Sequence, residues 1–217
     1  LTLVRYNTDG SLDSSFGGDG VVSADLGYYS SRAQAVALQP DGKIVAGGKM
    51  ADAGTEQFLL ARFNFDGSID PTFGSGGWVR TDIEYFSWIN AIVIQTDGKI
   101  VAVGKSFIQA ATNQEVWAVA RYNSDGSLDT SFGTGGILTP NLLVCTGCNQ
   151  EAYAVLQQPD NRLVIMGRVS EDNSGSTYNT ALISLNTDGS YDNTFDGDGS
   201  DIENLSPGNE GPRAMAL

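Results

Sequence analysis

Histidine is absent from the 217 residues, which removes Ser-His-Asp and Cys-His catalysis and every imidazole metal site. Cysteine is nearly absent, because the only two lie in the segment Cys145-Thr-Gly-Cys148. A zinc site needs four ligands, and no second pair is there to complete it. We therefore expect a structural disulfide or two free thiols. Redox chemistry is the lesser alternative, since no strand–helix–strand pattern surrounds the pair.

Basic side chains are scarce: 12 Lys and Arg stand against 26 Asp and Glu, for a net charge of −14. Such a surface repels nucleic-acid backbones and anionic membranes unless a local basic patch exists, and the sequence shows none. No apolar run approaches the roughly 20 residues that a membrane-spanning helix needs. We expect neither a nucleic-acid partner nor membrane insertion.

Glycine and hydrophobic residues are plentiful. Hydrophobic residues make up 41% of the chain, enough for a sizeable core, and 27 glycines accompany only 6 prolines. Glycine supplies the positive φ angles that tight turns between short strands require. This composition favours an all-β fold.

Two phrases recur along the chain. Arg-Tyr-Asn-x-Asp-Gly-Ser-Leu-Asp-x-Ser-Phe-Gly occupies residues 5–17, with close copies at 62–74 and 121–133 and a looser one at 186–195. Ala-Val-Ala-Leu-Gln-Pro-Asp-Gly-Lys-Ile-Val-Ala occupies residues 35–46, recurs at 91–102 and decays at 154–165. The phenylalanines that mark the first phrase are 57, 59 and 63 residues apart, so the unit is constant and its connections vary.

Each unit is expected to hold four strands, at about residues 33–39, 43–49, 57–64 and 77–82 in the first complete copy. Asp-Gly between apolar runs is a strong hairpin signal, so the first two strands should pair directly. Segments such as 35–38 and 58–61 are apolar on both faces, as expected of a sheet covered by neighbours on both sides. Four antiparallel strands per repeat predict the blades of a β-propeller.

The two phrases resemble the Delta-60 tandem repeat of bacterial, largely secreted or surface-displayed proteins, and are more distantly similar to the repeats of NHL propellers. The resemblance covers nearly the whole chain. It implies a propeller without assigned chemistry and brings no catalytic residues with it. The last copy departs from the pattern at Ser184, where the others carry Arg, and at Asp196, where they carry Gly. That blade is expected to be distorted or close to an end.

The repeat phase divides the chain into about three and a half blades of one propeller segment. We expect a partial blade over 1–26, complete blades over 33–82, 89–139 and 151–203, and the first strand of another blade over 212–217. This arrangement predicts that the chain continues on both sides in a larger protein. A four-bladed ring closed between the termini is the alternative, but it would lack one strand.

The repeated turns offer candidate metal ligands. Asp9 and Asp13 lie in one such turn, and Asp196, Asp198 and Asp201 form a denser acidic cluster that would suit Ca²⁺. The repeated aspartates are more simply turn residues that accept backbone N–H groups. We therefore expect no cofactor, with Ca²⁺ at 196–201 as the exception to test.

The repeated arginines have two readings. Arg5, Arg62 and Arg121 could line a binding ring, but we expect them to clamp acidic turns within or between blades.

Aromatic residues gather in equivalent connections between successive units: Tyr28 and Tyr29 in one, and Tyr85, Phe86 and Trp88 in the next. These rings could contact a glycan or a protein partner, or could instead pack between blades. All length variation falls on this end of the blades, opposite the repeated turns, and specificity is usually built on such loops.

The sequence thus favours a non-enzymatic binding or adhesion scaffold in a secreted or surface protein, with a protein or glycan partner on the variable-loop face. One alternative is a propeller hydrolase or lyase that uses carboxylates and Ca²⁺. It would need polar residues converging from several blades, and the sequence shows no such convergence. The other alternative is a purely structural spacer.

Overall fold

The computed structural model describes residues 1–27, 29–52, 54–108, 114–140, 142, 148–170, 177–203, 212 and 214–216. Within these residues the chain forms fourteen β-strands and no helix. Accordingly, none of the described segments is a helix that could cross a membrane. The predicted all-β fold is confirmed.

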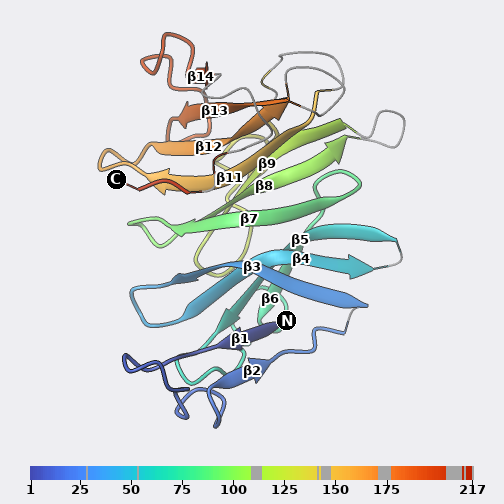
Figure 1. Cartoon of the computed structure of the whole chain (residues 1–217), viewed down its shortest axis with the longest axis vertical. Coiled ribbons are helices and arrows are strands. Elements are labelled where there is room, and N and C mark those ends of the chain that lie inside the picture. Colours follow the sequence, from blue (N-terminus) through green and yellow to red (C-terminus); the bar gives the residue numbers. More distant parts are fainter. Residues whose placement is uncertain are drawn as a thin grey trace.

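The strands form three four-stranded antiparallel sheets and one two-stranded sheet, stacked side by side along the molecule (Figure 1). The two-stranded sheet contains β1 (Thr2–Val4) and β2 (Val21–Ser23). The first four-stranded sheet contains β3 (Ser30–Leu38), β4 (Ile44–Asp52), β5 (Thr55–Phe63) and β6 (Trp78–Thr81). The second contains β7 (Ser87–Ile94), β8 (Ile100–Ile108), β9 (Gln114–Tyr122) and β10 (Ile137–Leu138). The third contains β11 (Gln150–Gln157), β12 (Leu163–Ser170), β13 (Tyr178–Leu185) and β14 (Ser200–Glu203).

Each four-stranded sheet pairs its strands in sequence order, so each repeat is one antiparallel propeller blade, as predicted. The Asp-Gly hairpin between the first two strands forms as expected. Asp41 accepts the Lys43 amide at 3.1 Å, and Gly42 takes a φ of 84°. In the third blade Asn161 replaces this glycine and keeps a φ of 69°.

Two details differ from the expected strand bounds. The outer strands are short, with four residues in β6 and β14 and two in β10, and each pairs with only part of its neighbour. Residues 212 and 214–216, expected to open a further blade, carry no strand. A first strand pairs only with the second strand of its own blade, and no such partner is present among the described residues.

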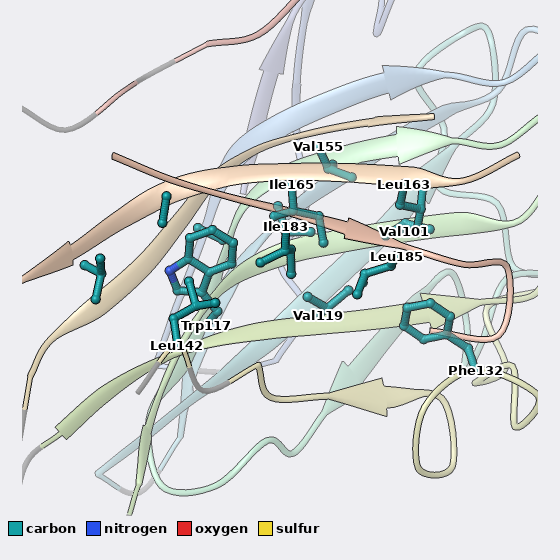
Figure 2. Close-up of a cluster of buried hydrophobic side chains, with 14 residues drawn as sticks. Val101, Trp117, Val119, Phe132, Leu142, Val155, Leu163, Ile165, Ile183 and Leu185 are labelled. Carbon is teal, nitrogen blue, oxygen red and sulfur yellow. The ribbon is translucent and has the colours of Figure 1, made fainter. Parts of the chain in front are cut away.

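The blades are joined by continuous apolar packing. Figure 2 shows the cluster between the second and third blades, where Trp117 and Val101 meet Val155 and Ile183. Residues 57–63 of β5 and residues 100–106 of β8 are buried without a gap, so both faces of these strands are covered. This agrees with the prediction that each blade lies between two neighbours.

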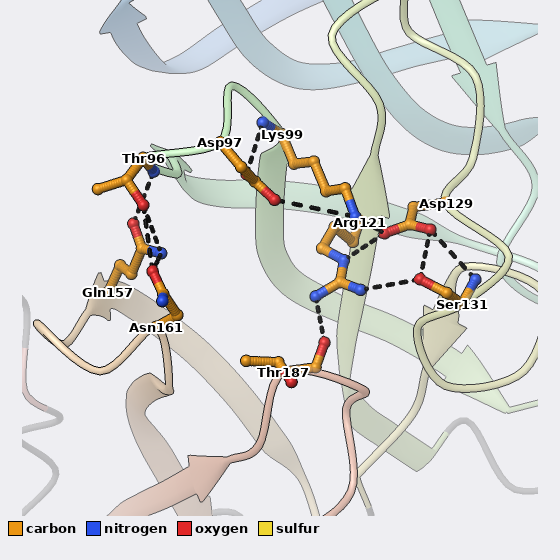
Figure 3. A network of polar contacts seen from close by, with 9 residues as sticks. All are labelled: Thr96, Asp97, Lys99, Arg121, Asp129, Ser131, Gln157, Asn161 and Thr187. Atoms are coloured by element: carbon orange, nitrogen blue, oxygen red, sulfur yellow. Dashed lines mark hydrogen bonds and ion pairs between the residues drawn. The ribbon is translucent and has the colours of Figure 1, made fainter.

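The repeated arginine clamps its own blade to the next one. Arg121 donates from Nε to Asp129 at 2.7 Å and from Nη1 to the carbonyl oxygen of Thr187 in the third blade at 2.5 Å (Figure 3). Its guanidinium also lies over the Phe132 ring, 4.5 Å from the centroid. Lys99 adds a second cation to Asp129 at 2.9 Å. The structural interpretation of these arginines is confirmed.

The same clamp occurs at each of the two preceding junctions. Arg5 bonds Asp13 and the carbonyl oxygen of Phe65, and Arg62 bonds Asp70 and the carbonyl oxygen of Ser124. We call this repeated contact the arginine clamp. A backbone bond accompanies it at every junction, where the glycine amide after each phenylalanine donates to the next blade's turn. These bonds are Gly17 to Asp66, Gly74 to Asp125 and Gly133 to Asp188, at 2.8–2.9 Å.

The third blade departs from this scheme at the positions that the sequence singled out. Ser184 replaces the arginine and bonds Asp192 at 3.1 Å. Arg162, in the turn directly before β12, supplies the missing cation to Asp192. Asp196 replaces the glycine with a φ of 45°. The turn is therefore kept. Within the described residues, neither the arginine contact nor the amide contact to the carbonyl oxygens of a following blade is made.

Replacing Arg121 with alanine should lower the free energy of unfolding by about 2–4 kcal/mol, because the buried Asp129 loses its forked partner and Thr187 its donor. Arg121→Lys should lower the free energy of unfolding by about half as much, since an ammonium group cannot make both contacts. Urea denaturation measures both. The control is Arg80→Ala, whose exposed pair with Asp82 should contribute under about 1 kcal/mol. Equal losses for Arg121→Ala and Arg80→Ala would show that the clamp is not a major source of stability.

Acid should unfold the protein by protonating the clamp carboxylates. Burial alone would raise the pKa of Asp70 and Asp129, but lysine, hydroxyl and arginine partners hold both well below the ordinary range. The Thr194 hydroxyl, with Arg162, lowers the pKa of Asp192 to about 2.

A lowered folded-state pKa contributes stability above the unfolded value near 4, and this stability is lost as pH falls through the folded value. We expect the urea midpoint to decline progressively from about pH 5 toward pH 2, and less steeply in an Asp129→Asn variant. A midpoint that stays constant between pH 6 and pH 3 would contradict this assignment.

Candidate binding site at the propeller axis

The first strand of every complete blade carries a bulge at the same place. The register shifts between Ala33 and Ala35 in β3, and at the equivalent points of β7 and β11. The extra residues are Gln34, Asn90 and Tyr153. A bulge re-aims a side chain without ending the strand. Three polar side chains are thereby placed at equivalent positions on the innermost strands.

A glycine opposite each bulge makes it possible. A Cβ on Gly48 would lie 1.9 Å from the carbonyl oxygen of Arg32, and one on Gly104 would lie 2.0 Å from that of Trp88. Gly167 faces Glu151 in the same way, at 2.2 Å. The bulged strand approaches so closely that only glycine fits.

A cavity of about 430 Å³ opens where the bulged strands meet, and we call it the axial pocket. Three consecutive blades contribute to its wall, which is formed by Gln34, Trp88, Asn90, Glu151, Tyr153 and Arg168. Amide, carboxylate, phenol and guanidinium groups therefore surround one space. The structure shows the convergence of polar residues from several blades that the sequence did not reveal.

Glu151 is the centre of the polar network in the axial pocket. It accepts Asn90 Nδ2 at 3.0 Å, the Tyr153 hydroxyl at 2.7 Å and Arg168 Nη2 at 2.9 Å. Burial alone would raise its pKa, but the charge of Lys105, with these hydrogen bonds and Arg168, holds the pKa below its ordinary value. Glu151 is therefore a fixed anionic acceptor at neutral pH.

The residue after each of these glycines is a cation. Lys49 pairs with Glu56 at 2.7 Å and Lys105 with Glu115 at 2.5 Å. Arg168, the third member, pairs with Glu151. The Gly-Lys or Gly-Arg pair repeated at 48–49, 104–105 and 167–168 is the signal in the sequence that could have located this site.

Four aromatic rings run from the surface to the axial pocket, and we call them the aromatic cluster. Tyr85 meets Phe86 edge-on at a centroid distance of 4.5 Å, and Phe86 meets Phe107 at 6.0 Å. Phe107 in turn contacts Trp88 at 5.7 Å. Sequence reasoning grouped Tyr85, Phe86 and Trp88 correctly and missed Phe107.

The predicted aromatic residues differ in exposure. Tyr29 is 89% exposed and Tyr85 is 48% exposed, so both can meet a partner. Phe86 and Trp88 are half-buried. The Trp88 ring has the ammonium groups of Lys49 and Lys105 at 4.8 Å and 4.4 Å from its centroid. These cation–π contacts hold Trp88 in the wall of the pocket. Tyr28 lies outside the described residues.

The acidic turn proposed for Ca²⁺ is not assembled as a metal site. Asp198 accepts the amide and hydroxyl of Ser200, at 2.9 Å and 3.0 Å, and Asp201 lies in β14 paired with Leu182. Across the part of the chain that the structure describes, no three carboxylate or cysteine side chains are grouped closely enough to hold an ion. Asp196, Asp198 and Asp201 do not converge, and Ca²⁺ binding there stays a prediction.

One cysteine of the Cys-x-x-Cys segment lies within the described residues. Cys148 is fully buried and disulfide-bonded. Cys145, the other cysteine of the sequence, lies outside the described residues. The disulfide precedes β11, the strand that carries Glu151 and Tyr153. A structural role is therefore favoured over free thiols.

Replacing Glu151 with glutamine should destabilise the fold by about 1–3 kcal/mol, because Arg168 loses its partner and Lys105 keeps only Glu115. Urea denaturation measures this loss. Glu56→Gln is the matched control: its pair with Lys49 is more exposed, so the loss should be smaller. If Glu151→Gln is as stable as the original chain, Glu151 does not organise the pocket.

No curated protein matches the sequence significantly. Among solved structures, the chain is similar to a GH43_12 retrieved from capybara gut metagenome, with 10% identity and a TM-score of 0.46. The similarity covers 83% of this chain and 32% of that one, so the chain spans about a third of that structure's length.

A family model described as "Domain of unknown function (DUF5122) beta-propeller" matches residues 1–16, 39–73, 95–132 and 158–195. Each matched segment ends at or next to the phenylalanine of a repeat, and together they cover more than half of the chain. The chain therefore belongs to the DUF5122 β-propeller family.

Proposed function

We propose that this chain is a non-enzymatic binding propeller that engages a glycan or protein partner at the axial pocket and the aromatic cluster. The observation that carries the proposal is the convergence of polar side chains from three blades beside a continuous row of aromatic rings. Pockets that fix a ligand combine apolar contact surface with a few convergent polar groups.

The position of the site within the blades supports a binding role. Tyr85 lies in the connection from one blade to the next, and Trp88 lies at the start of β7 directly after it. The length of this connection changes between repeats. The opposite ends of the blades carry the repeated Asp-Gly turns and the arginine clamps. Variable loops on a rigid scaffold are the usual location of binding specificity.

The charge state of the carboxylates favours binding over hydrolysis. A glycosidase-type mechanism needs one carboxylic acid whose raised pKa lets it donate a proton. Every carboxyl group with a shifted pKa in the described residues is shifted downward, Glu151 among them. An ionised Glu151 accepts hydrogen bonds from hydroxyl or amide groups of a ligand. The hydrolase or lyase alternative is tested by measuring whether the chain releases products from polysaccharides or esters.

An extracellular setting is part of the proposal. The repeated phrases resemble the Delta-60 repeat of secreted and surface-displayed bacterial proteins. The disulfide at Cys148 is a bond that persists in oxidising compartments. We infer an adhesion or recognition module within a larger exported protein.

Replacing Tyr85 with alanine should weaken partner binding at least about tenfold, because an exposed ring next to the pocket is a typical interface anchor. Glycan and peptide arrays identify a ligand, and calorimetry with the best array ligand gives the affinity. Thermal unfolding should be nearly unchanged. The matched control is Phe65→Ala, which removes a ring that is 67% exposed at the turn end of the blades.

Equal weakening by Phe65→Ala would place the partner on the turn face instead. Absence of any array ligand would favour a structural spacer. Release of products from array polysaccharides or esters would establish an enzyme.

A further inference from the structure

A second polar pocket lies at the turn end of the blades, between the second and third complete blades. Its volume is about 520 Å³, against about 430 Å³ for the axial pocket. Hairpin turns of both blades form its wall, with Gln95, Thr96 and Asp97 from one and Gln157 and Asn161 from the other. The volume falls within the roughly 300–1,000 Å³ of small-molecule sites. We call this space the turn pocket.

Three positions of the repeated phrase are polar at this junction and not at the junction before it. They hold Thr96, Gln157 and Asn161 in place of Pro40, Ile94 and Gly98. The three side chains meet across the blades (Figure 3): the Thr96 amide donates to Gln157 Oε1 at 2.9 Å, and the Thr96 hydroxyl donates to Asn161 Oδ1 at 3.1 Å. Asn161 takes a φ of 69°, which glycine adopts more readily. The departures from the repeat therefore gather in one wall of the turn pocket.

A buried glutamine in this wall has an unused acceptor. Gln95 is 5% exposed, and its Oε1 accepts no hydrogen bond from the described residues. Buried polar atoms are costly unless they are hydrogen-bonded, so most of them have a partner. Gln39, the equivalent residue one junction earlier, has the same unused oxygen but lacks the threonine, glutamine and asparagine beside it. The acceptor belongs to the repeat, whereas the polar groups that could hold a ligand against it belong to the turn pocket.

Other groups of the wall also have hydrogen-bonding capacity left. Asn161 uses Oδ1 to accept from Thr96 and from Gln157, which leaves its Nδ2 as a donor. Asp188 uses Oδ1 to accept the amide and hydroxyl of Ser190, which leaves Oδ2 as an acceptor. The turn pocket therefore offers both donors and acceptors to a ligand.

The charges of the turn pocket are balanced. Its wall holds the cations Lys99 and Arg121 and the carboxylates Asp97 and Asp188. Both cations are already bound to Asp129, at 2.9 Å and 2.7 Å. An anionic ligand would have to compete with this carboxylate for them. A neutral ligand with hydroxyl groups fits the wall better, because each hydroxyl both donates and accepts.

We propose that the turn pocket binds a neutral sugar residue of a glycan. One sugar hydroxyl donates to Gln95 Oε1, while others accept from Asn161 Nδ2 and donate to Asp188 Oδ2. Thr96 and Gln157 are positioning residues, because they hold Asn161 in the wall. The site lies at the opposite end of the blades from the aromatic cluster, so it is independent of the binding function proposed for the axial pocket.

The probes are tetrasaccharides of glucose, mannose, xylose and galactose, titrated by calorimetry into the whole 217-residue chain. At least one should bind saturably. Thr96→Pro, Gln157→Ile and Asn161→Gly together give this junction the residues of the preceding one, so this triple variant should fold. It should bind that sugar at least about tenfold more weakly, because it loses the donor and its two supports.

Gln95→Met tests the buried acceptor alone and should also weaken binding, with thermal unfolding nearly unchanged. Its matched control is Gln39→Met, which removes a similarly buried unused oxygen at the other junction and should leave binding normal. Equal effects of the two substitutions on binding would overturn the assignment of Gln95 to a ligand.

Other results would also overturn the proposal. If none of the four tetrasaccharides binds, the turn pocket is not a site for neutral sugars. If the triple variant binds as tightly as the original chain, the polar network serves only to join the blades. Tighter binding of tetragalacturonate would contradict a neutral ligand. Tyr85→Ala separates the two sites: unchanged sugar binding supports the turn pocket, whereas loss of binding would assign the sugar to the axial pocket.

Discussion

The arginine clamp is the contact on which the relative position of the blades depends. One guanidinium holds an aspartate of its own turn, a carbonyl oxygen of the next blade and the face of a phenylalanine ring. The planar fork fixes direction as well as distance, which a lysine could not do. Because the clamp recurs at equivalent positions, each blade is set against the next at the turn end, and the inner strands β3, β7 and β11 are brought side by side.

The axial pocket is a consequence of this spacing. Each inner strand carries a bulge, a glycine opposite the bulge and a cation beside that glycine. The clamps hold three such units next to one another, so that Asn90 of one blade reaches Glu151 of the next. Charges are balanced locally, with each cation paired to a glutamate, despite the net charge of −14. The side chains that line the pocket can therefore differ from one repeat to the next, while the strands, bulges and clamps stay the same.

The two ends of the blades have separate roles. At the turn end, the side chains of the repeated phrases are used in hydrogen bonds that keep the fold. Asp125, for example, accepts both the amide and the hydroxyl of Ser127. At the opposite end, the side chains that differ between repeats face the axial pocket or solvent, as Arg32, Trp88 and Glu151 do at one equivalent position. This division explains why the polar residues of the repeated phrases serve the fold, whereas the variable residues at the other end shape the pocket and the surface around it.

The sequence alone determined the blade, because its signals are local. Asp-Gly turns fix hairpins within a few residues, and apolar runs at constant spacing predict four strands per repeat. The arginine clamp and the aromatic grouping were also foreseen, since both recur at fixed offsets within the repeat. The tertiary structure decided which side chains meet across blades. Glu151 and Asn90 are 61 residues apart in the chain, and neither belongs to a repeated phrase. Their meeting depends on bulges and on a close approach between strands at the repeated glycines. The Gly-Lys and Gly-Arg pairs mark these positions in the sequence, but they do not show which side chains of neighbouring blades come together there.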